Sequence, residues 1–243
     1  MAEPTPLERY VTWTVQRTQD SDALLTPDQY ADAVRAALAM YSKHRPRTLV
    51  EDLAGDGDYD YDLPDDWVEG SSSLKTVEHP AGQREPIVLE AEDYTLYQTA
   101  DATVLRFLQL IPVAGETIRL TFTAPHVIDD TTTTVPVNDA NAVADLAASV
   151  ACEWLSSRFS QSGEPTLQAD SADHTSKARD FALRATAFRN QYYDYMGLPR
   201  PGAKTSDGRE ASSASVAAAS AVRDWDTDLS TGDDRLTHPR RRR

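Results

Sequence analysis

Residues 138–159 read NDANAVADLAASVACEWLSSRF, and residues 171–198 read SADHTSKARDFALRATAFRNQYYDYMGL. In both stretches apolar side chains recur roughly every 3.6 residues, which is the period of an amphipathic helix. The recurring positions are Val143, Leu146, Ala147, Val150, Trp154 and Phe159 in the first stretch, and Phe181, Ala182, Ala185, Phe188, Tyr192 and Tyr195 in the second. This pattern predicts two consecutive helices, at about 138–160 and 171–197, on which the rest of the chain packs.

The ends of this helix pair carry start and stop signals. The first helix follows Pro136, and Asn138 or Asp139 is available to cap its exposed N–H groups. The second ends at Gly197, followed by Leu198 and Pro199. Glycine readily adopts the left-handed conformation after a helix, and proline cannot continue one.

A third helix is predicted at residues 26–45. Thr26 and Gln29 have the spacing of a capping box, with Pro27 at the first helical position. An apolar stripe follows, and it consists of Tyr30, Val34, Ala37, Leu38 and Tyr41. Residues 1–25 are predicted to be an N-terminal arm, in which the segment from Tyr10 to Val15 forms either a short strand or a packing arm.

Four basic residues gather at the end of the 26–45 helix. They are Lys43, His44, Arg45 and Arg47. Positive charge at this end offsets the helix dipole, which is one interpretation of the cluster. The other is a salt bridge to an acidic neighbour, either within the chain or in another subunit.

Between about residues 48 and 124 the apolar period changes from that of a helix to two, which is typical of β-strands. The predicted strands are Leu49–Leu53, Ser73–His79, Ile87–Glu90, Tyr94–Gln98, Thr103–Leu110 and Glu116–Ala124. Ile111–Gly115 supplies the proline and glycine of a turn between adjacent antiparallel strands. The sequence therefore predicts an α+β fold: a helical bundle with an inserted small antiparallel sheet or sandwich.

The chain changes character after the helix pair. Residues 26–198 form the predicted core, and residues 199–243 form an extended C-terminal tail in which Trp225 and Leu229 are the outstanding large apolar residues. The tail ends in Arg240, Arg241, Arg242 and Arg243. A segment with so few large apolar residues cannot offset its own ordering entropy, so it is either disordered or ordered along a partner, with Trp225 as the anchor.

Composition limits the function classes. The chain has 39 acidic and 24 basic residues, a formal net charge of −15, which argues against a surface that grips nucleic acid. A single cysteine, Cys152, excludes an internal disulfide and fits a reducing compartment. No signal peptide or membrane-spanning run is visible, so we expect a soluble protein made in the cytoplasm, without contact to a membrane.

The sequence gives no motif for catalysis, a cofactor or a metal. The alternating aspartates of residues 56–62 resemble the start of a calcium loop, but Tyr61 stands where glycine is needed and Trp67 where the bidentate glutamate belongs. We therefore interpret this segment as a mobile acidic hairpin tip. Cys152, inside a predicted helix, is interpreted as a buried small apolar residue.

The polar side of the last predicted helix is basic. It carries Lys177, Arg179, Arg184 and Arg189, and Tyr193 also points away from the apolar stripe. Such a side is usually solvated. In an acidic protein Arg179, Arg184, Arg189 and Tyr193 are also candidates for contact between subunits.

The order of these segments resembles the head–tail connector (adaptor) proteins of tailed bacteriophages. The resemblance covers roughly residues 22–198 and lies in the succession of motifs. These are Leu24–Tyr30 opening a helix that ends in Tyr41–Pro46, then Tyr61–Gly70, Val77–Pro80, Asp93–Tyr97, the strand Ile118–Thr123 and the closing helix pair.

The resemblance implies a structural virion protein of the neck, between capsid and tail, and not an enzyme. Such adaptors form a homo-oligomeric ring, commonly a dodecamer, beneath the portal protein. They extend the DNA channel, through which the genome passes without sequence-specific binding, and attach the downstream neck or tail protein. The implied portal contacts are Trp225, Leu229, Arg240, Arg241, Arg242 and Arg243 of the C-terminal tail.

Two other classes stay open. One is a different neck or tail component, such as a stopper or tail-completion protein. The other is a soluble enzyme or ligand-binding protein whose site cannot be seen in the sequence.

Overall fold

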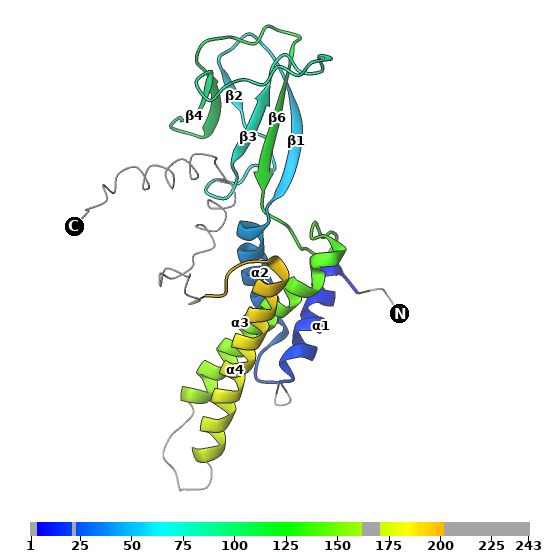
Figure 1. Ribbon diagram of the computed structural model, residues 1–243, viewed down its shortest axis with the longest axis vertical. Helices are drawn as coiled ribbons and strands as arrows, with labels where there is room; N and C mark the ends of the chain where they lie inside the picture. The colour runs from blue at the N-terminus through cyan, green and yellow to red at the C-terminus, as the bar shows by residue number, and fades with distance from the viewer. Residues whose placement is uncertain (1–3, 21–22, 162–170, 202–243) are drawn as a thin grey trace, which may run out of the picture.

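The computed structural model describes residues 4–20, 23–161 and 171–201, and it divides them into a helical body and a β module (Figure 1). The β module consists of residues 47–124, and the helical body consists of the described residues before and after it. The helices and strands follow one another along the chain in a single order. These are α1 (Pro6–Thr18), α2 (Pro27–His44), β1 (Arg47–Ala54), β2 (Asp60–Asp62), β3 (Leu74–Glu78), β4 (Tyr94–Gln98), β5 (Thr103–Phe107), β6 (Thr117–Ala124), the short 3-10 helix η1 (Val137–Asp139), α3 (Ala140–Gln161) and α4 (Ser171–Met196). The predicted α+β class is confirmed.

Helix α3 lies at the centre of the helical body, where it packs against α1, α2 and α4. Its first half is rich in alanine and is buried on nearly every side, because small side chains let neighbouring backbones approach closely. The buried apolar residues between Ala142 and Ala151 are Ala142, Val143, Ala144, Leu146, Ala147, Ala148 and Ala151. Cys152 is fully buried among them, as the sequence predicted.

Helix α1 corrects the interpretation of the N-terminal arm as a strand. Thr5 caps the helix: its hydroxyl accepts a hydrogen bond from the Glu8 N–H, and the Glu8 carboxylate accepts one from the Thr5 N–H. Tyr10, Thr14 and Thr18 then face the body and are buried. The β-branched residues of this segment have modest helix propensity, and burial of one helical face against α3 outweighs it.

Helix α2 begins as predicted. The Thr26 hydroxyl accepts from the Gln29 N–H at 3.3 Å, and the Gln29 side-chain oxygen accepts from the Thr26 N–H at 2.9 Å. Pro27 occupies the first helical turn. These contacts confirm the capping box, and the helix ends one residue before the predicted boundary.

The β module contains two antiparallel sheets, ordered β1-β6-β3 and β2-β5-β4. Both contribute to a single apolar core, which contains Tyr61, Val77, Leu105, Phe107, Ile118, Leu120, Phe122 and Ala124. The predicted antiparallel insertion is therefore confirmed. It takes the form of two sheets with a shared core.

Three details of the predicted strands are wrong. The segment 87–90 makes only an isolated bridge between Val88 and Glu78. Ile111–Gly115 joins β5 to β6, which belong to different sheets, so it is not a hairpin turn. Asp60–Asp62 forms strand β2 paired with β5, which replaces the predicted mobile acidic tip. All three depend on pairing between distant segments, which local periodicity does not encode.

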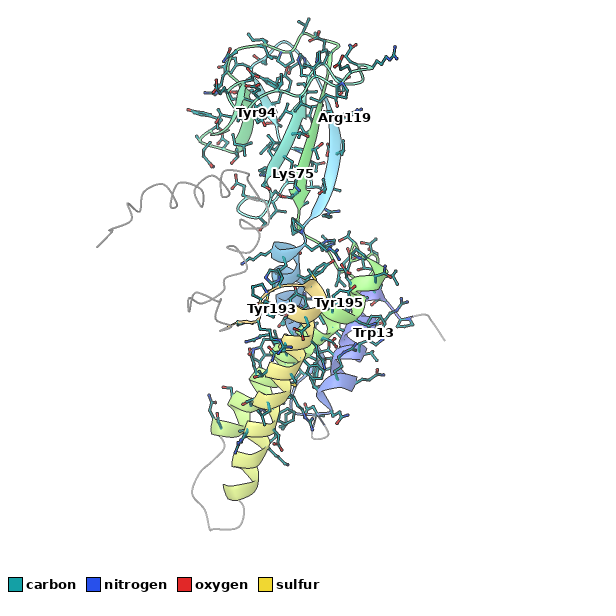
Figure 2. The ribbon with its side chains drawn as sticks, in the orientation of Figure 1. Trp13, Lys75, Tyr94, Arg119, Tyr193 and Tyr195 are labelled. Atoms are coloured by element: carbon teal, nitrogen blue, oxygen red, sulfur yellow. The ribbon has the colours of Figure 1, made fainter. Side chains whose placement is uncertain are left out.

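The chain enters the β module between α2 and β1 and returns between β6 and η1 (Figure 1). The end of α4 lies beside these two connections. In Figure 2 Tyr193 and Tyr195 of α4 lie at this end of the helical body, whereas Arg119 lies in the β module. The region where these two connections, residues 45–46 and 125–136, meet the ends of α2 and α4 and the start of α3 is called the junction.

Candidate functional site

Asp139 is the centre of the junction. Its carboxylate accepts hydrogen bonds from the Tyr41 hydroxyl at 2.5 Å, from Arg45 Nη1 at 2.7 Å and from the Tyr195 hydroxyl at 2.8 Å. Only 2% of Asp139 is exposed. One side chain thus joins the ends of α2 and α4 to the start of α3.

This arrangement corrects the predicted role of Asp139 as a helix cap. No side-chain cap is present at η1, and the Asp139 oxygens are directed to neighbouring helices instead. The Asn138 carbonyl also accepts a hydrogen bond from the Tyr195 hydroxyl, at 2.8 Å. Tertiary partners therefore take precedence over local capping here.

The electrostatics of the junction follow from this geometry. Burial by itself raises the pKa of the Asp139 carboxyl, but hydrogen bonds from Tyr41, Arg45 and Tyr195 outweigh it and hold that pKa below its usual range. Burial, and then the hydrogen bond to Asp139, raise the pKa of Tyr41. Asp139 is thus an ionised acceptor and Tyr41 a neutral donor, with Arg45 supplying the balancing charge.

His126 connects the two chain segments that cross the junction. It is buried, and its ring nitrogens face two backbone carbonyls: Nε2 lies 3.0 Å from that of Arg45 and Nδ1 lies 3.0 Å from that of Thr134. Its backbone N–H donates to the Ser42 hydroxyl at 2.9 Å. Burial lowers the pKa of His126. A neutral ring that carries its proton on Nε2 donates a hydrogen bond to the Arg45 carbonyl. Its Nδ1 then accepts a hydrogen bond from the Thr134 hydroxyl, which lies 3.2 Å away.

The basic cluster at the end of α2 makes ion pairs within the chain. Arg45 pairs with Asp139 and Arg47 with Asp66, each at 2.7 Å. His44 instead places Nδ1 2.7 Å from the Tyr192 hydroxyl, and burial, followed by the charge of Lys43, lowers its pKa. The salt-bridge interpretation of this cluster is therefore confirmed inside one subunit.

The four residues predicted to contact another subunit lie apart along α4. Arg179 is exposed and makes no hydrogen bond or ion pair with the described residues. Arg184 donates to the Thr18 carbonyl at 3.2 Å, and Arg189 pairs with Glu153. Tyr193 is half-buried, 5.5 Å from the Tyr192 ring. Contact of these residues with a second subunit stays a prediction.

The six residues predicted to contact the portal lie outside the described residues. They are Trp225, Leu229, Arg240, Arg241, Arg242 and Arg243. Their role stays a prediction from the resemblance.

The formal charge is concentrated in the β module. Residues 47–124 contain 16 acidic and five basic residues, a formal net charge of −11 of the total of −15. Arginine pairs neutralise few of these carboxylates: Arg106 pairs with Asp60 at 2.6 Å and Arg119 with Asp52 at 2.7 Å. The module is therefore the negative end of the molecule.

The described residues offer little for catalysis or metal binding. No three His, Cys, Asp or Glu side chains among them are placed to hold a metal ion. Burial raises the pKa of Cys152 to about 11, so its thiol stays protonated near neutral pH. None of the described helices has the length and apolar composition to cross a membrane.

Several hollows are nonetheless present among the described residues, and two of them lie close to the helix ends. A cavity of about 360 Å³ between the end of α2 and the β module is lined by residues that include Lys43, Ser71 and Thr123. A groove of about 390 Å³ between α1 and α2 is lined mainly by apolar residues such as Leu7 and Val11. Neither brings together ionisable groups in an arrangement that performs acid–base chemistry.

The sequence did not reveal that Tyr41, Arg45 and Tyr195 meet at Asp139, nor the role of Arg106. Tyr41 and Asp139 are separated by 98 residues, so no local spacing connects them. For Arg106 a signal existed: the alternating Tyr59-Asp60-Tyr61-Asp62 has the period of a strand with carboxylates on one face. An arginine on the neighbouring strand, such as Arg106, can form an ion pair with a carboxylate on that face.

Comparison with protein-family models and with curated protein sequences gives no match. Among solved structures, a chain in the neck of an empty GTA particle computed with C6 symmetry is 16% identical, with 74% of this chain and 92% of that chain covered and a TM-score of 0.28. A chain in the neck of a native GTA particle computed with C12 symmetry is 17% identical. The match covers 74% of this chain and 94% of that chain, with a TM-score of 0.26.

A third similar chain comes from the virion of a native gene transfer agent (GTA) particle. It is 17% identical, with 72% of this chain and 88% of that chain covered and a TM-score of 0.27. The structural neighbours of this chain are thus proteins of the neck and virion of GTA particles. At these TM-scores the superpositions do not establish membership of a family.

Proposed function

We propose that this protein is a head–tail adaptor of a tailed-bacteriophage-type particle. It is a structural protein that forms a ring under the portal, extends the DNA channel and attaches the tail. The resemblance of residues 22–198 to such adaptors supports this function, and so does the geometry of the junction.

The observation that carries the proposal is the division into a helical body and an acidic β module, with the buried Asp139 carboxylate holding Arg45 at the point where the chain leaves the body for the module. In a closed ring every copy makes the same contacts, so every copy must hold its two parts in the same relative direction. The buried Asp139 carboxylate supports such a fixed direction, because it ties the chain before β1, at Arg45, to the chain after β6, and breaking this contact leaves an uncompensated buried charge.

The charge supports the same function. A net charge of −15 repels the phosphates of DNA, so a ring of such subunits lets the genome pass without holding it. Within this proposal Arg179, Arg184, Arg189 and Tyr193 contact the neighbouring copy. The tail residues Trp225, Leu229 and Arg240–Arg243 contact the portal.

The test is the composition and symmetry of the particle neck. Quantitative mass spectrometry of purified particles is expected to give about as many copies of this chain as of the portal protein. Electron microscopy of the neck is expected to place the chain in a ring directly under the portal. A chain that is absent from particles, or present in one or two copies, rules the function out. A ring further from the portal shows a stopper or tail-completion protein instead.

A further inference from the structure

The outer face of the β2-β5-β4 sheet carries an ordered stack of an arginine and two tyrosines. The Arg106 guanidinium carbon lies 3.6 Å from the centre of the Tyr97 ring and 5.2 Å from that of Tyr59. Asp60 holds the guanidinium with two hydrogen bonds, Nε to Oδ1 at 2.6 Å and Nη2 to Oδ2 at 2.7 Å. The neighbours of Arg106 on β5, Leu105 and Phe107, point to the other side, into the core.

This stack is open to solvent although its side chains contact one another closely. Tyr59 is 49% exposed and Tyr97 is 43% exposed. Tyrosine and arginine are among the residues that most often dominate the energy of protein–protein contacts. Here the bidentate pair with Asp60 and the ring contacts order the side chains before any partner arrives, which lowers the entropy cost of binding.

The surroundings of the stack determine which partner fits it. Asp58 and Asp62 on either side of Asp60 are exposed, and the whole β module has a formal net charge of −11. A nucleic acid is repelled by such a surface. The helical body of a second copy fits poorly, because residues 1–46 and 125–201 together contain 16 acidic and 11 basic residues and are negative as well.

We propose that the Tyr59–Arg106–Tyr97 face docks a second protein, different from this chain, whose contact surface places lysine or arginine side chains beside apolar ones. The tyrosine rings cover the apolar part, and the unpaired carboxylates of the β module attract the basic part and speed its association. Resting on the proposed function, this partner is the next neck component on the tail side of the ring.

The first experiment is site-specific crosslinking in the full-length protein within assembled particles. A photoreactive benzoylphenylalanine replaces Tyr97, and in a matched control it replaces Leu183, which is exposed on α4. After irradiation, the crosslinked chains are identified by mass spectrometry. The expected result is a crosslink from position 97 to a different neck or tail protein through a lysine- or arginine-containing peptide, with no crosslink from position 183 to that protein.

The outcomes separate this inference from the proposed function. Particles that contain the chain but give no crosslink at position 97, or a crosslink to another copy or to the portal, overturn the docking face and leave the adaptor function standing. Particles that lack the chain overturn both. A crosslink to a protein surface without basic residues overturns the assigned partner chemistry.

A second experiment removes the stack without removing charge. The double variant Tyr59→Ser, Tyr97→Ser is compared with Val50→Ser, which changes another exposed strand residue on β1. The double variant is expected to join the ring normally and to reduce the fraction of particles with tails about tenfold, the effect of roughly 1.4 kcal/mol. Normal tail attachment by a double variant that is present in the ring overturns the proposal. If that variant does not fold, the crosslink at position 97 decides.

Discussion

The Tyr195 hydroxyl, near the end of α4, donates a hydrogen bond to Asp139 over 2.8 Å, and the same carboxylate accepts from Arg45 where the chain leaves for the β module. Tyr195 therefore connects the last described helix to the point at which the chain returns from the β module. Because the donors come from α2 and α4, the position of the module depends on the integrity of the helical body. In Figure 2 Tyr195 lies at the end of the body that faces the module.

Replacing Asp139 by asparagine is expected to lower the free energy of unfolding by about 2 kcal/mol, because it removes the buried negative charge that the Tyr41 hydroxyl and the Arg45 guanidinium bind. The matched control is Asp194→Asn, since Asp194 pairs with Arg200 at 2.6 Å and both side chains are 53% exposed. That control is expected to lose much less stability, because solvent screens an exposed ion pair. Urea unfolding of the purified proteins measures both, and equal losses would contradict the importance of the junction.

Stability is expected to fall as the pH is lowered from about 7 to about 5. Burial lowers the pKa of both His44 and His126, so the unfolded chain binds more protons than the folded chain in this range. Each histidine contributes its full share of folding stability at pH values above its pKa in the unfolded chain. This contribution is lost as the pH falls through its pKa in the folded protein. Unfolding free energies at a series of pH values test this. The variant His126→Gln is expected to show a shallower slope, and stability that increases toward pH 5 would refute the assignment.

The centre of the helical body is expected to be far more sensitive than its surface. Leu146→Ala on α3 removes a fully buried side chain and is expected to cost about 2–5 kcal/mol. Leu183→Ala on α4 changes an exposed one and is expected to stay within about 0.5 kcal/mol. Thermal and urea unfolding give both values. Similar losses for the two variants would show that α3 is not the central helix in solution.

Charge reversal at Arg179 is expected to weaken ring formation about tenfold without changing the free energy of unfolding, because this exposed side chain has no partner among the described residues. The control is Arg35→Glu, which reverses an exposed charge on α2 that pairs with Asp32. Mass photometry over a concentration series measures assembly. Rings that form equally well from both variants would remove Arg179 from the interface.

Deletion of residues 203–243 is expected to leave a folded core and to weaken attachment to the portal. Trp225→Ala in the complete chain is expected to act in the same direction with a smaller effect. Thermal unfolding monitors the core, and co-sedimentation with purified portal protein monitors attachment. Normal portal binding and normal DNA retention by the truncated chain would count against the role of the C-terminal tail.

Local features of the fold were predictable from the sequence. The helix pair, the capping box at Thr26 and the strand ending at Ala124 all depend on side chains a few residues apart. The same capping pattern at Thr5 and Glu8 marks α1, yet for the valines and threonines that follow the sequence left open a short strand or a packing arm. At that segment, burial against α3 was the stronger effect, and a sequence pattern does not contain it.

The sequence alone determined the α+β class, the central helices, the buried Cys152 and the excess of negative charge. Apolar period, helix capping and composition depend only on residues that are close together in the chain. Only the tertiary structure decided which strands share a sheet, that Asp139 joins three helices, and that Arg106 stacks between Tyr59 and Tyr97. These contacts join residues up to 98 positions apart. Their geometry depends on how the apolar surfaces of separate elements are buried together, and no local pattern specifies that.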